Sequence, residues 1–209
     1  MKNILLLSST KFLIDNPHLM FDKPLEQMRM AYVTTASKGA VDLDYMERAK
    51  NIFAANKYNY EELDIEGKDE NWLSKYLKGF EVVYVQGGNT YYLLKAIRES
   101  GFDKVIRKLL TEGLIYIGTS AGSYAACPTI EMMGWKRPND YNRFGVTDLT
   151  GMNLVPFMLS VHYKPEYEEL LREKIKNSKI PVRILTDDQA ILVKDEDYQL
   201  VGKGEEIKL

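Results

Sequence analysis

Cysteine and histidine are scarce in this sequence of 209 residues, and each scarcity excludes a class of site. The single cysteine, Cys127, rules out a disulfide framework and any Cys-x-x-Cys metal or redox motif. The two histidines, His18 and His162, argue against a metal centre with several histidine ligands. We therefore expect neither a metal nor an organic cofactor.

An excess of basic charge and a long apolar run are also missing. The 28 Lys and Arg residues nearly balance the 30 Asp and Glu residues, which argues against a nucleic-acid partner. No run approaches the length of about 18 apolar residues that a membrane span needs, so no membrane partner is expected. Residues 1–7 lack the long apolar core and cleavage site of a signal peptide. These absences predict a cytoplasmic protein.

The composition is that of an ordinary globular protein, with 45% hydrophobic and 28% charged residues. A chain of this length buries about 70% of its unfolded surface, so it folds without disulfides or metals. The sequence contains no internal repeat, low-complexity tract or linker. We expect residues 1–209 to form a single catalytic domain.

Short apolar runs alternate with helical patterns along the chain, which predicts a mostly parallel sheet with helices on both faces, an α/β fold. The last two runs are separated by a charged turn and predict an antiparallel hairpin. In such a fold, ligands bind at the carboxyl ends of the strands. The expected strands are Ile4–Ser8, Met30–Thr34, Tyr60–Ile65, Val82–Gln86, Leu114–Gly118, Leu154–Val161, Val182–Leu185, Ala190–Val193 and Tyr198–Val201.

The segment Gly118-Thr119-Ser120-Ala121-Gly122 follows an expected strand and opens a short helical run. Gly-x-Ser-x-Gly in this setting is a nucleophile elbow, in which glycine avoids clashes with neighbouring backbone. Ser120 would project at a helix N-terminus, where the N–H of Ala121 favours developing negative charge. Cys127 lies seven residues later and cannot share this turn, so we expect it to be buried and inert.

A second glycine-containing turn, Gln86-Gly87-Gly88-Asn89-Thr90, follows the expected strand that ends at Gln86. Asn89 or Thr90 could cap the following helix, and the glycines could simply form the turn. If this turn lies beside Ser120, its backbone N–H groups could provide the second oxyanion donor. Gly88 is the expected donor.

An activated serine needs a base and an acid that orients this base. His162 follows the expected strand Leu154–Val161, again at a carboxyl end, and is the candidate base. Acids between the serine and the histidine are Glu131, Asp140 and Asp148. Asp140 lies in an irregular loop over residues 132–151, and Glu131 has a longer side chain that could also reach His162. The sequence leaves this choice open.

The order and spacing of three segments resemble the peptidase E family, the S51 serine peptidases, which includes aspartyl dipeptidases and cyanophycinases. The resemblance implies a three-layer, flavodoxin-like α/β fold similar to the class I glutamine amidotransferases. It also implies a Ser–His–acid triad that cleaves peptides after an N-terminal acidic residue. The segments are Val85–Thr90, Gly118–Gly122 with Pro128–Ile130, and Asn153–Phe157 leading to His162-Tyr163.

The resemblance also implies roles for individual residues. Asn139-Asp140 is similar to the family's acid segment and favours Asp140, while members with a glutamate keep Glu131 as the alternative. Asn89 and Thr90 belong to a shared motif and are expected to contact substrate. Aspartyl dipeptidases carry an arginine after the histidine that meets the substrate carboxylate, and Arg172 is the residue that resembles it. Because its segment is shorter here, a preference for aspartate does not follow.

We therefore expect a serine peptidase that hydrolyses small peptides, including Asp-X dipeptides as candidates, through an acyl-enzyme. Two alternatives remain open: a hydrolase of another acyl bond on the same triad, and a non-catalytic relative that binds a small ligand. The expected partner is a small peptide substrate, and a homodimer is left open.

Overall fold

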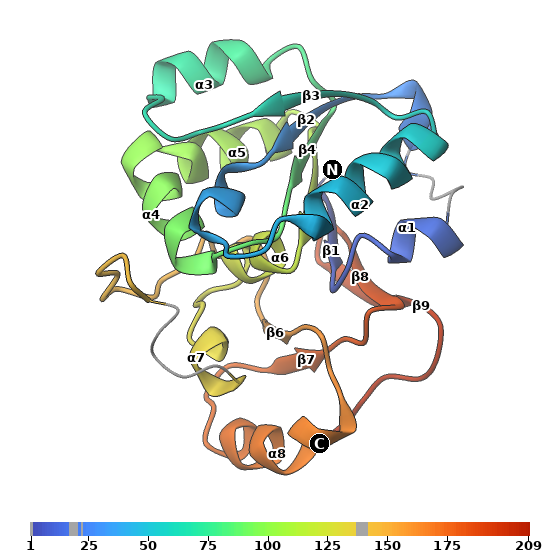
Figure 1. Ribbon diagram of the computed structural model, residues 1–209, viewed down its shortest axis with the longest axis vertical. Helices are drawn as coiled ribbons and strands as arrows, with labels where there is room; N and C mark the ends of the chain where they lie inside the picture. Colours follow the sequence, from blue (N-terminus) through green and yellow to red (C-terminus); the bar gives the residue numbers. More distant parts are fainter. Residues whose placement is uncertain (1, 17–20, 22, 137–141) are drawn as a thin grey trace.

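Residues 2–16, 21, 23–136 and 142–209 are described by the computed structural model shown in Figure 1. The apolar runs form strands: β1 (Asn3–Leu7), β2 (Arg29–Val33), β3 (Asn59–Leu63), β4 (Val82–Val85), β5 (Ile115–Thr119), β6 (Met158–Ser160), β7 (Val182–Ile184), β8 (Gln189–Lys194) and β9 (Asp197–Gly202). The α-helices are α1 (Phe12–Asp15), α2 (Asp44–Ala55), α3 (Glu70–Leu77), α4 (Thr90–Ser100), α5 (Phe102–Thr111), α6 (Ala121–Ala126), α7 (Met132–Lys136) and α8 (Glu168–Lys176). Short 3₁₀ turns lie at Leu25–Gln27, Thr35–Gly39 and Pro165–Tyr167.

The main sheet has the strand order β3-β2-β4-β5-β1-β8-β9. Its first five strands are parallel, and β8 and β9 add an antiparallel hairpin beside β1. The α/β fold and the terminal hairpin predicted from the sequence are thus confirmed. Because β1 lies between β5 and β8, the N-terminal strand is central, and its carboxyl end lies beside that of β5.

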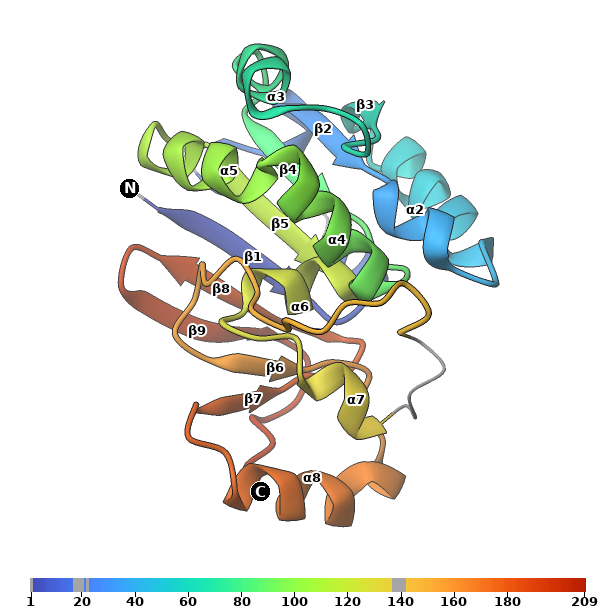
Figure 2. The same ribbon diagram turned by 90° about the vertical axis from the view of Figure 1, so that its left-hand side faces the viewer.

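Strand residues alternate between two apolar cores, as the period of two of a β-strand requires. In β1, Ile4 and Leu6 belong to one core, whereas Leu5 and Leu7 belong to the other. Helices α3, α4 and α5 lie on one side of the sheet, and α1 and α2 lie on the other (Figures 1 and 2). Both faces are covered, which gives three layers.

The expected strand Leu154–Val161 is shorter in the structure and belongs to a separate sheet. Only Met158–Ser160 is a strand, and β6 pairs in parallel with β7. The preceding residues bond the end of α6 instead, because the N–H groups of Met152 and Leu154 donate to Ala125 and Ala126 carbonyls. The pair β6–β7 lies with α7 and α8 at one end of the molecule (Figure 2). None of the helices in the described part of the chain is long and apolar enough to cross a membrane.

Candidate active site

Ser120 lies in a sharp turn between β5 and α6, with backbone angles φ 49° and ψ −105°. A positive φ is uncommon for a residue other than glycine and marks a constrained position. The two flanking glycines make room for this turn. A Cβ on Gly118 would lie 2.7 Å from the Gly122 backbone, and one on Gly122 would lie 2.2 Å from the Val85 carbonyl oxygen. The strand–turn–helix geometry expected of a nucleophile elbow is therefore present.

Buried hydroxyl groups hold the elbow in place. The Tyr116 hydroxyl donates to the Gly122 carbonyl at 2.7 Å. The Ser123 hydroxyl lies 2.7 Å from the carbonyl oxygens of both Gly118 and Leu7. The Ser120 N–H also donates to the Leu7 carbonyl, at 3.1 Å. These contacts fix the turn to the carboxyl end of β1.

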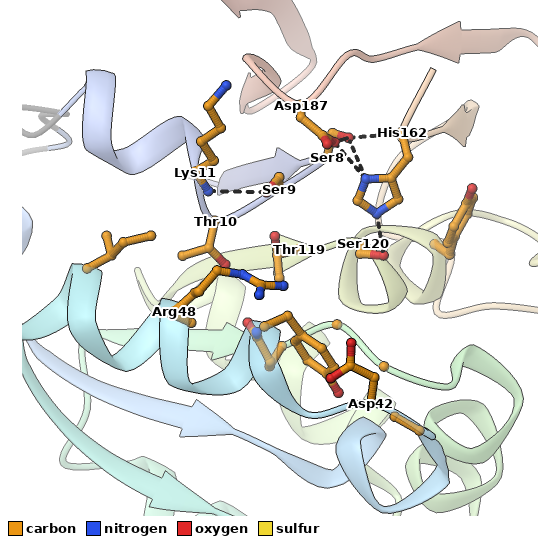
Figure 3. Close-up of a pocket in the computed structure, with 18 of the residues that line it drawn as sticks. Ser8, Ser9, Thr10, Lys11, Asp42, Arg48, Thr119, Ser120, His162 and Asp187 are labelled. Atoms are coloured by element: carbon orange, nitrogen blue, oxygen red, sulfur yellow. Dashed lines mark hydrogen bonds and ion pairs between the residues drawn. The ribbon is translucent and has the colours of Figure 1, made fainter. Parts of the chain in front are cut away.

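The structure brings His162 to Ser120. The Nε2 atom of His162 lies 3.0 Å from the Ser120 hydroxyl oxygen, within hydrogen-bond distance (Figure 3). His162 follows β6 by two residues and has a positive φ of 55°. Its backbone N–H donates to the hydroxyl of buried Ser8 at 2.8 Å. The imidazole therefore reaches the nucleophile from the smaller sheet.

The acid beside His162 is Asp187, which lies in the turn between β7 and β8. Its Oδ1 atom is 2.6 Å from His162 Nδ1 and accepts a hydrogen bond from the Ser8 hydroxyl at 2.7 Å. The hydrogen bond from His162, with its charge, holds the pKa of Asp187 below the usual value. In the tautomer that donates Nδ1–H to this carboxylate, Nε2 has a lone pair that can accept a hydrogen bond from the Ser120 hydroxyl.

Of the acids considered from the sequence, neither Glu131 nor Asp148 bonds His162. Glu131 is exposed just before α7, and His162 Nδ1 bonds Asp187 rather than Glu131. Asp148 bonds the Thr150 N–H and pairs with Arg98. Asp140 lies outside the described residues. Asp187 lies beyond the stretch between the serine and the histidine. The signal for it in the sequence is its place two residues after the expected strand Val182–Leu185, at the carboxyl end.

The turn after β4 passes directly beside the nucleophile. A Cβ on Gly87 would lie 3.1 Å from the Ser120 Cβ. Gly88 has a φ of 143°, and a Cβ there would lie 2.4 Å from the Ala36 carbonyl oxygen, so only glycine fits. Among the described residues, no backbone carbonyl outside the regular helices and strands accepts a bond from the N–H of Gly88 or Ala121.

The residues expected to contact substrate do not line the pocket around Ser120. Asn89 is buried, and its side chain caps α4 by accepting the Tyr92 N–H at 3.0 Å. Thr90 is the first residue of that helix and is fully buried. Arg172 lies on α8, where it pairs with Glu168 at 2.9 Å. The interpretation of Asn89 as a helix cap is thus confirmed.

A cavity of about 840 Å³ opens in front of Ser120, His162 and Asp187. Most of the other lining residues come from the loop after β1, from α2 with the loop before it, and from the ends of β4, β5 and α7. Among these are Ser9, Thr10, Lys11, Asp42, Arg48, Gln86 and Lys136. This position at the carboxyl ends of the parallel strands is typical of ligand sites in open α/β sheets.

Cys127 is buried, as expected. Burial raises the pKa of its thiol to about 12, so the reactive thiolate is scarce at neutral pH. Within the described ranges, no group of three or more His, Cys, Asp or Glu side chains is arranged to hold a metal ion.

The fold and the Ser120–His162 pair are typical of serine hydrolases. The family model for peptidase family S51 matches residues 4–201. The chain therefore belongs to peptidase family S51 and is a hydrolase of the serine peptidase class. This family assignment also disfavours the alternative of a purely ligand-binding relative.

Individual relatives agree with this assignment. An uncharacterized peptidase of Pasteurella multocida (strain Pm70) is 29% identical over 97% of this chain and 98% of its own length. Peptidase E of a Nostoc species is 29% identical over 83% of this chain and 72% of its own length. The crystal structure of a candidate peptidase E protein from Listeria monocytogenes EGD-e has a TM-score of 0.84 and 25% identity, covering 98% of this chain and 100% of that one.

Proposed function

We propose that this peptidase hydrolyses short peptides through a triad of Ser120, His162 and Asp187. The observation that carries the proposal is the continuous hydrogen-bonded chain from Ser120 Oγ to His162 Nε2 and from His162 Nδ1 to Asp187 Oδ1. Its three members come from three different loops and meet at the wall of one cavity. Asp187 takes the place in the triad that the sequence analysis gave to Asp140 or Glu131.

In the proposed mechanism, Ser120 Oγ attacks the scissile carbonyl carbon while His162 Nε2 takes its proton. Asp187 stabilises the imidazolium that forms. The imidazolium then donates this proton to the leaving amine as the carbon–nitrogen bond breaks, which leaves an acyl-enzyme. Water, activated by His162, hydrolyses the ester and restores Ser120.

The N–H groups of Gly88 and Ala121 are the proposed oxyanion donors. The carbonyl oxygen becomes negative during attack and needs donors that are already in place. Ala121 begins α6 directly after the nucleophile, and Gly88 follows Gly87, where an added Cβ would lie 3.1 Å from the Ser120 Cβ. The close approach of the two turns supports this pairing.

The test is release of free amino acid from X-Leu dipeptides, with Asp, Glu, Asn, Gly or Lys at X. The wild type is expected to hydrolyse at least one member, and Ser120→Ala to lower kcat by about 10⁶-fold. A Ser123→Ala variant is a control for loss of fold, since Ser123 supports the same elbow but does not react. Equal rates for wild type and Ser120→Ala would refute the proposed nucleophile.

A further inference from the structure

Gln86 is a buried polar residue whose side-chain oxygen has no hydrogen-bond partner. It is 1% exposed, lies directly after β4 and lines the cavity. Its backbone is fixed, because the N–H donates to the Val33 carbonyl at 3.0 Å, yet Oε1 makes no bond. Buried amide groups are nearly always hydrogen-bonded in folded proteins. An unpartnered amide at a cavity wall therefore points to a polar ligand group.

Arg48 is a second polar residue that lines the cavity. It projects from α2 into the cavity toward Thr119, the residue that precedes Ser120 (Figure 3). In the part of the chain that the structure describes, no carboxylate lies within ion-pair distance of Arg48. Guanidinium groups bind carboxylates through paired, parallel hydrogen bonds, so an unpaired arginine in a pocket favours an anionic ligand group.

The other cations of the cavity are already engaged. Lys11 Nζ lies 2.8 Å from Asp188 Oδ1. Lys136 Nζ donates to the Val161 carbonyl and lies over the Tyr167 ring. Arg172, the arginine expected to meet a substrate carboxylate, pairs with Glu168 and does not line the cavity. Among the described residues, Arg48 is thus the cavity arginine or lysine that has no ion pair or hydrogen bond.

We propose that Gln86 and Arg48 form a substrate subsite beside Ser120, in which Arg48 binds a free carboxylate of the peptide and the Gln86 amide binds the adjacent peptide group. The subsite lies next to the nucleophile because Gln86 precedes Gly87, where an added Cβ would lie 3.1 Å from the Ser120 Cβ. The carboxylate comes either from an acidic side chain or from the C-terminus of a short peptide. Both sources present the same chemistry to Arg48.

This inference rests on the proposed peptidase mechanism, and the experiment separates the two carboxylate sources. The probes are two matched pairs: Asp-Leu with Asn-Leu, and Gly-Leu with Gly-Leu amide. Arg48→Met keeps the length of the side chain and removes its charge. We expect it to lower kcat/KM about 10- to 100-fold for the acid of one pair and to leave the matching amide nearly unchanged.

Gln86→Met is expected to lower kcat/KM by about 3- to 10-fold on all four peptides, because the amide contacts the shared peptide group. Two controls accompany these variants. Ser160→Ala removes a buried hydroxyl that also has no partner but lies outside the cavity, so it reports the cost of altering a buried polar residue. Arg172→Met tests the rival arginine.

The subsite is overturned if Arg48→Met lowers kcat/KM equally for the acid and the amide within both pairs, or lowers kcat/KM for no peptide. If Arg172→Met instead lowers kcat/KM selectively for the acid, carboxylate binding belongs to α8, and the proposed subsite is also overturned. Calorimetry with the Ser120→Ala variant separates the subsite from the mechanism. If the wild type hydrolyses none of the peptides, the proposed mechanism fails. The subsite is still supported if Ser120→Ala binds the acid of one pair more tightly than the amide and this difference disappears in Ser120→Ala/Arg48→Met. Absence of any binding overturns the subsite.

Discussion

At the scale of single residues, Ser8 joins two members of the proposed triad. Its hydroxyl accepts the His162 backbone N–H and donates to the Asp187 carboxylate. We propose that Ser8 positions both groups, and Ser8→Ala should lower kcat between about 10- and 100-fold with a smaller change in KM. Steady-state kinetics measures kcat and KM of Ser8→Ala. The control is Ser160→Ala, which removes a buried hydroxyl that has no hydrogen-bond partner. An equal loss in both variants would indicate a general packing effect.

The lowered pKa of Asp187 makes the stability of the folded protein depend on pH. A carboxylate whose pKa is lower in the folded state adds stability above its ordinary pKa of about 4, and this stability is lost as the pH falls through the folded-state value. Because Asp187 is half-exposed, the contribution is at most about 1 kcal/mol.

Asp187→Asn is therefore expected to lower kcat at pH 7 by about 10⁴-fold, since the imidazole loses its orientation and charge partner. Wild type and variant should differ slightly in free energy of unfolding at pH 7 and converge below pH about 4. Urea titrations at several pH values measure this difference. A gap that widens as the pH falls would contradict the assignment of the carboxylate.

At the scale of elements, the elbow between β5 and α6 depends on close approach to β4. A Cβ at Gly122 would meet the Val85 carbonyl oxygen, whereas one at Gly134, in α7, would have its nearest neighbour at 3.9 Å. Gly122→Ala should lower the free energy of unfolding by about 1–3 kcal/mol and displace Ser120. Gly134→Ala should be neutral or stabilising by up to about 1 kcal/mol. Urea denaturation that ranks the two variants equally would refute this account.

Elements with strong local signals could be predicted from the sequence. The strands β1, β2, β4 and β5 are short apolar runs, and the elbow has a glycine at each position where backbone crowds it. The region after α6 could not be predicted in the same way. Leu154 begins an apolar run that is typical of a strand, but its N–H donates to the Ala126 carbonyl at the end of α6, a long-range contact that periodicity does not encode.

The proposed acid, Asp187, could also not be predicted from local sequence patterns. The sequence singles out Ser120 and His162 as candidates because each follows an expected strand and the chain has only two histidines. Asp187 is one of many acids, and its approach to His162 depends on the parallel pairing of β6 with β7. Arg48 and Gln86 lie in a helix and at a strand end that carry no motif. Only the packing of α2 against the sheet places them at one cavity.

At the scale of the whole molecule, Ser120 belongs to the main sheet, while His162 and Asp187 follow strands of the smaller one. Met158 and Leu159 of β6 are fully buried in the same apolar core that includes Val83 and Tyr116. A shared core predicts one cooperative unfolding transition, consistent with the expectation of a single domain.

The two tryptophans test this cooperativity, because Trp72 lies on α3 beside the main sheet and Trp135 on α7 beside the smaller one. In Trp72→Phe and Trp135→Phe variants, urea-induced fluorescence changes should have coincident midpoints and coincide with loss of activity. An earlier midpoint for the Trp135 signal would show that the smaller sheet opens on its own.

The position of Asp187 between β7 and β8 has a consequence for biosynthesis. During translation, the nucleophile and the base leave the ribosome well before the acid, and β8, which completes the pairing of β1, follows the acid. With the proposed triad, a nascent chain holds its serine without the carboxylate that makes it reactive. Proteolytic activity would then arise only after Asp187 has been synthesised and has left the ribosome, which protects neighbouring nascent polypeptides from an immature enzyme.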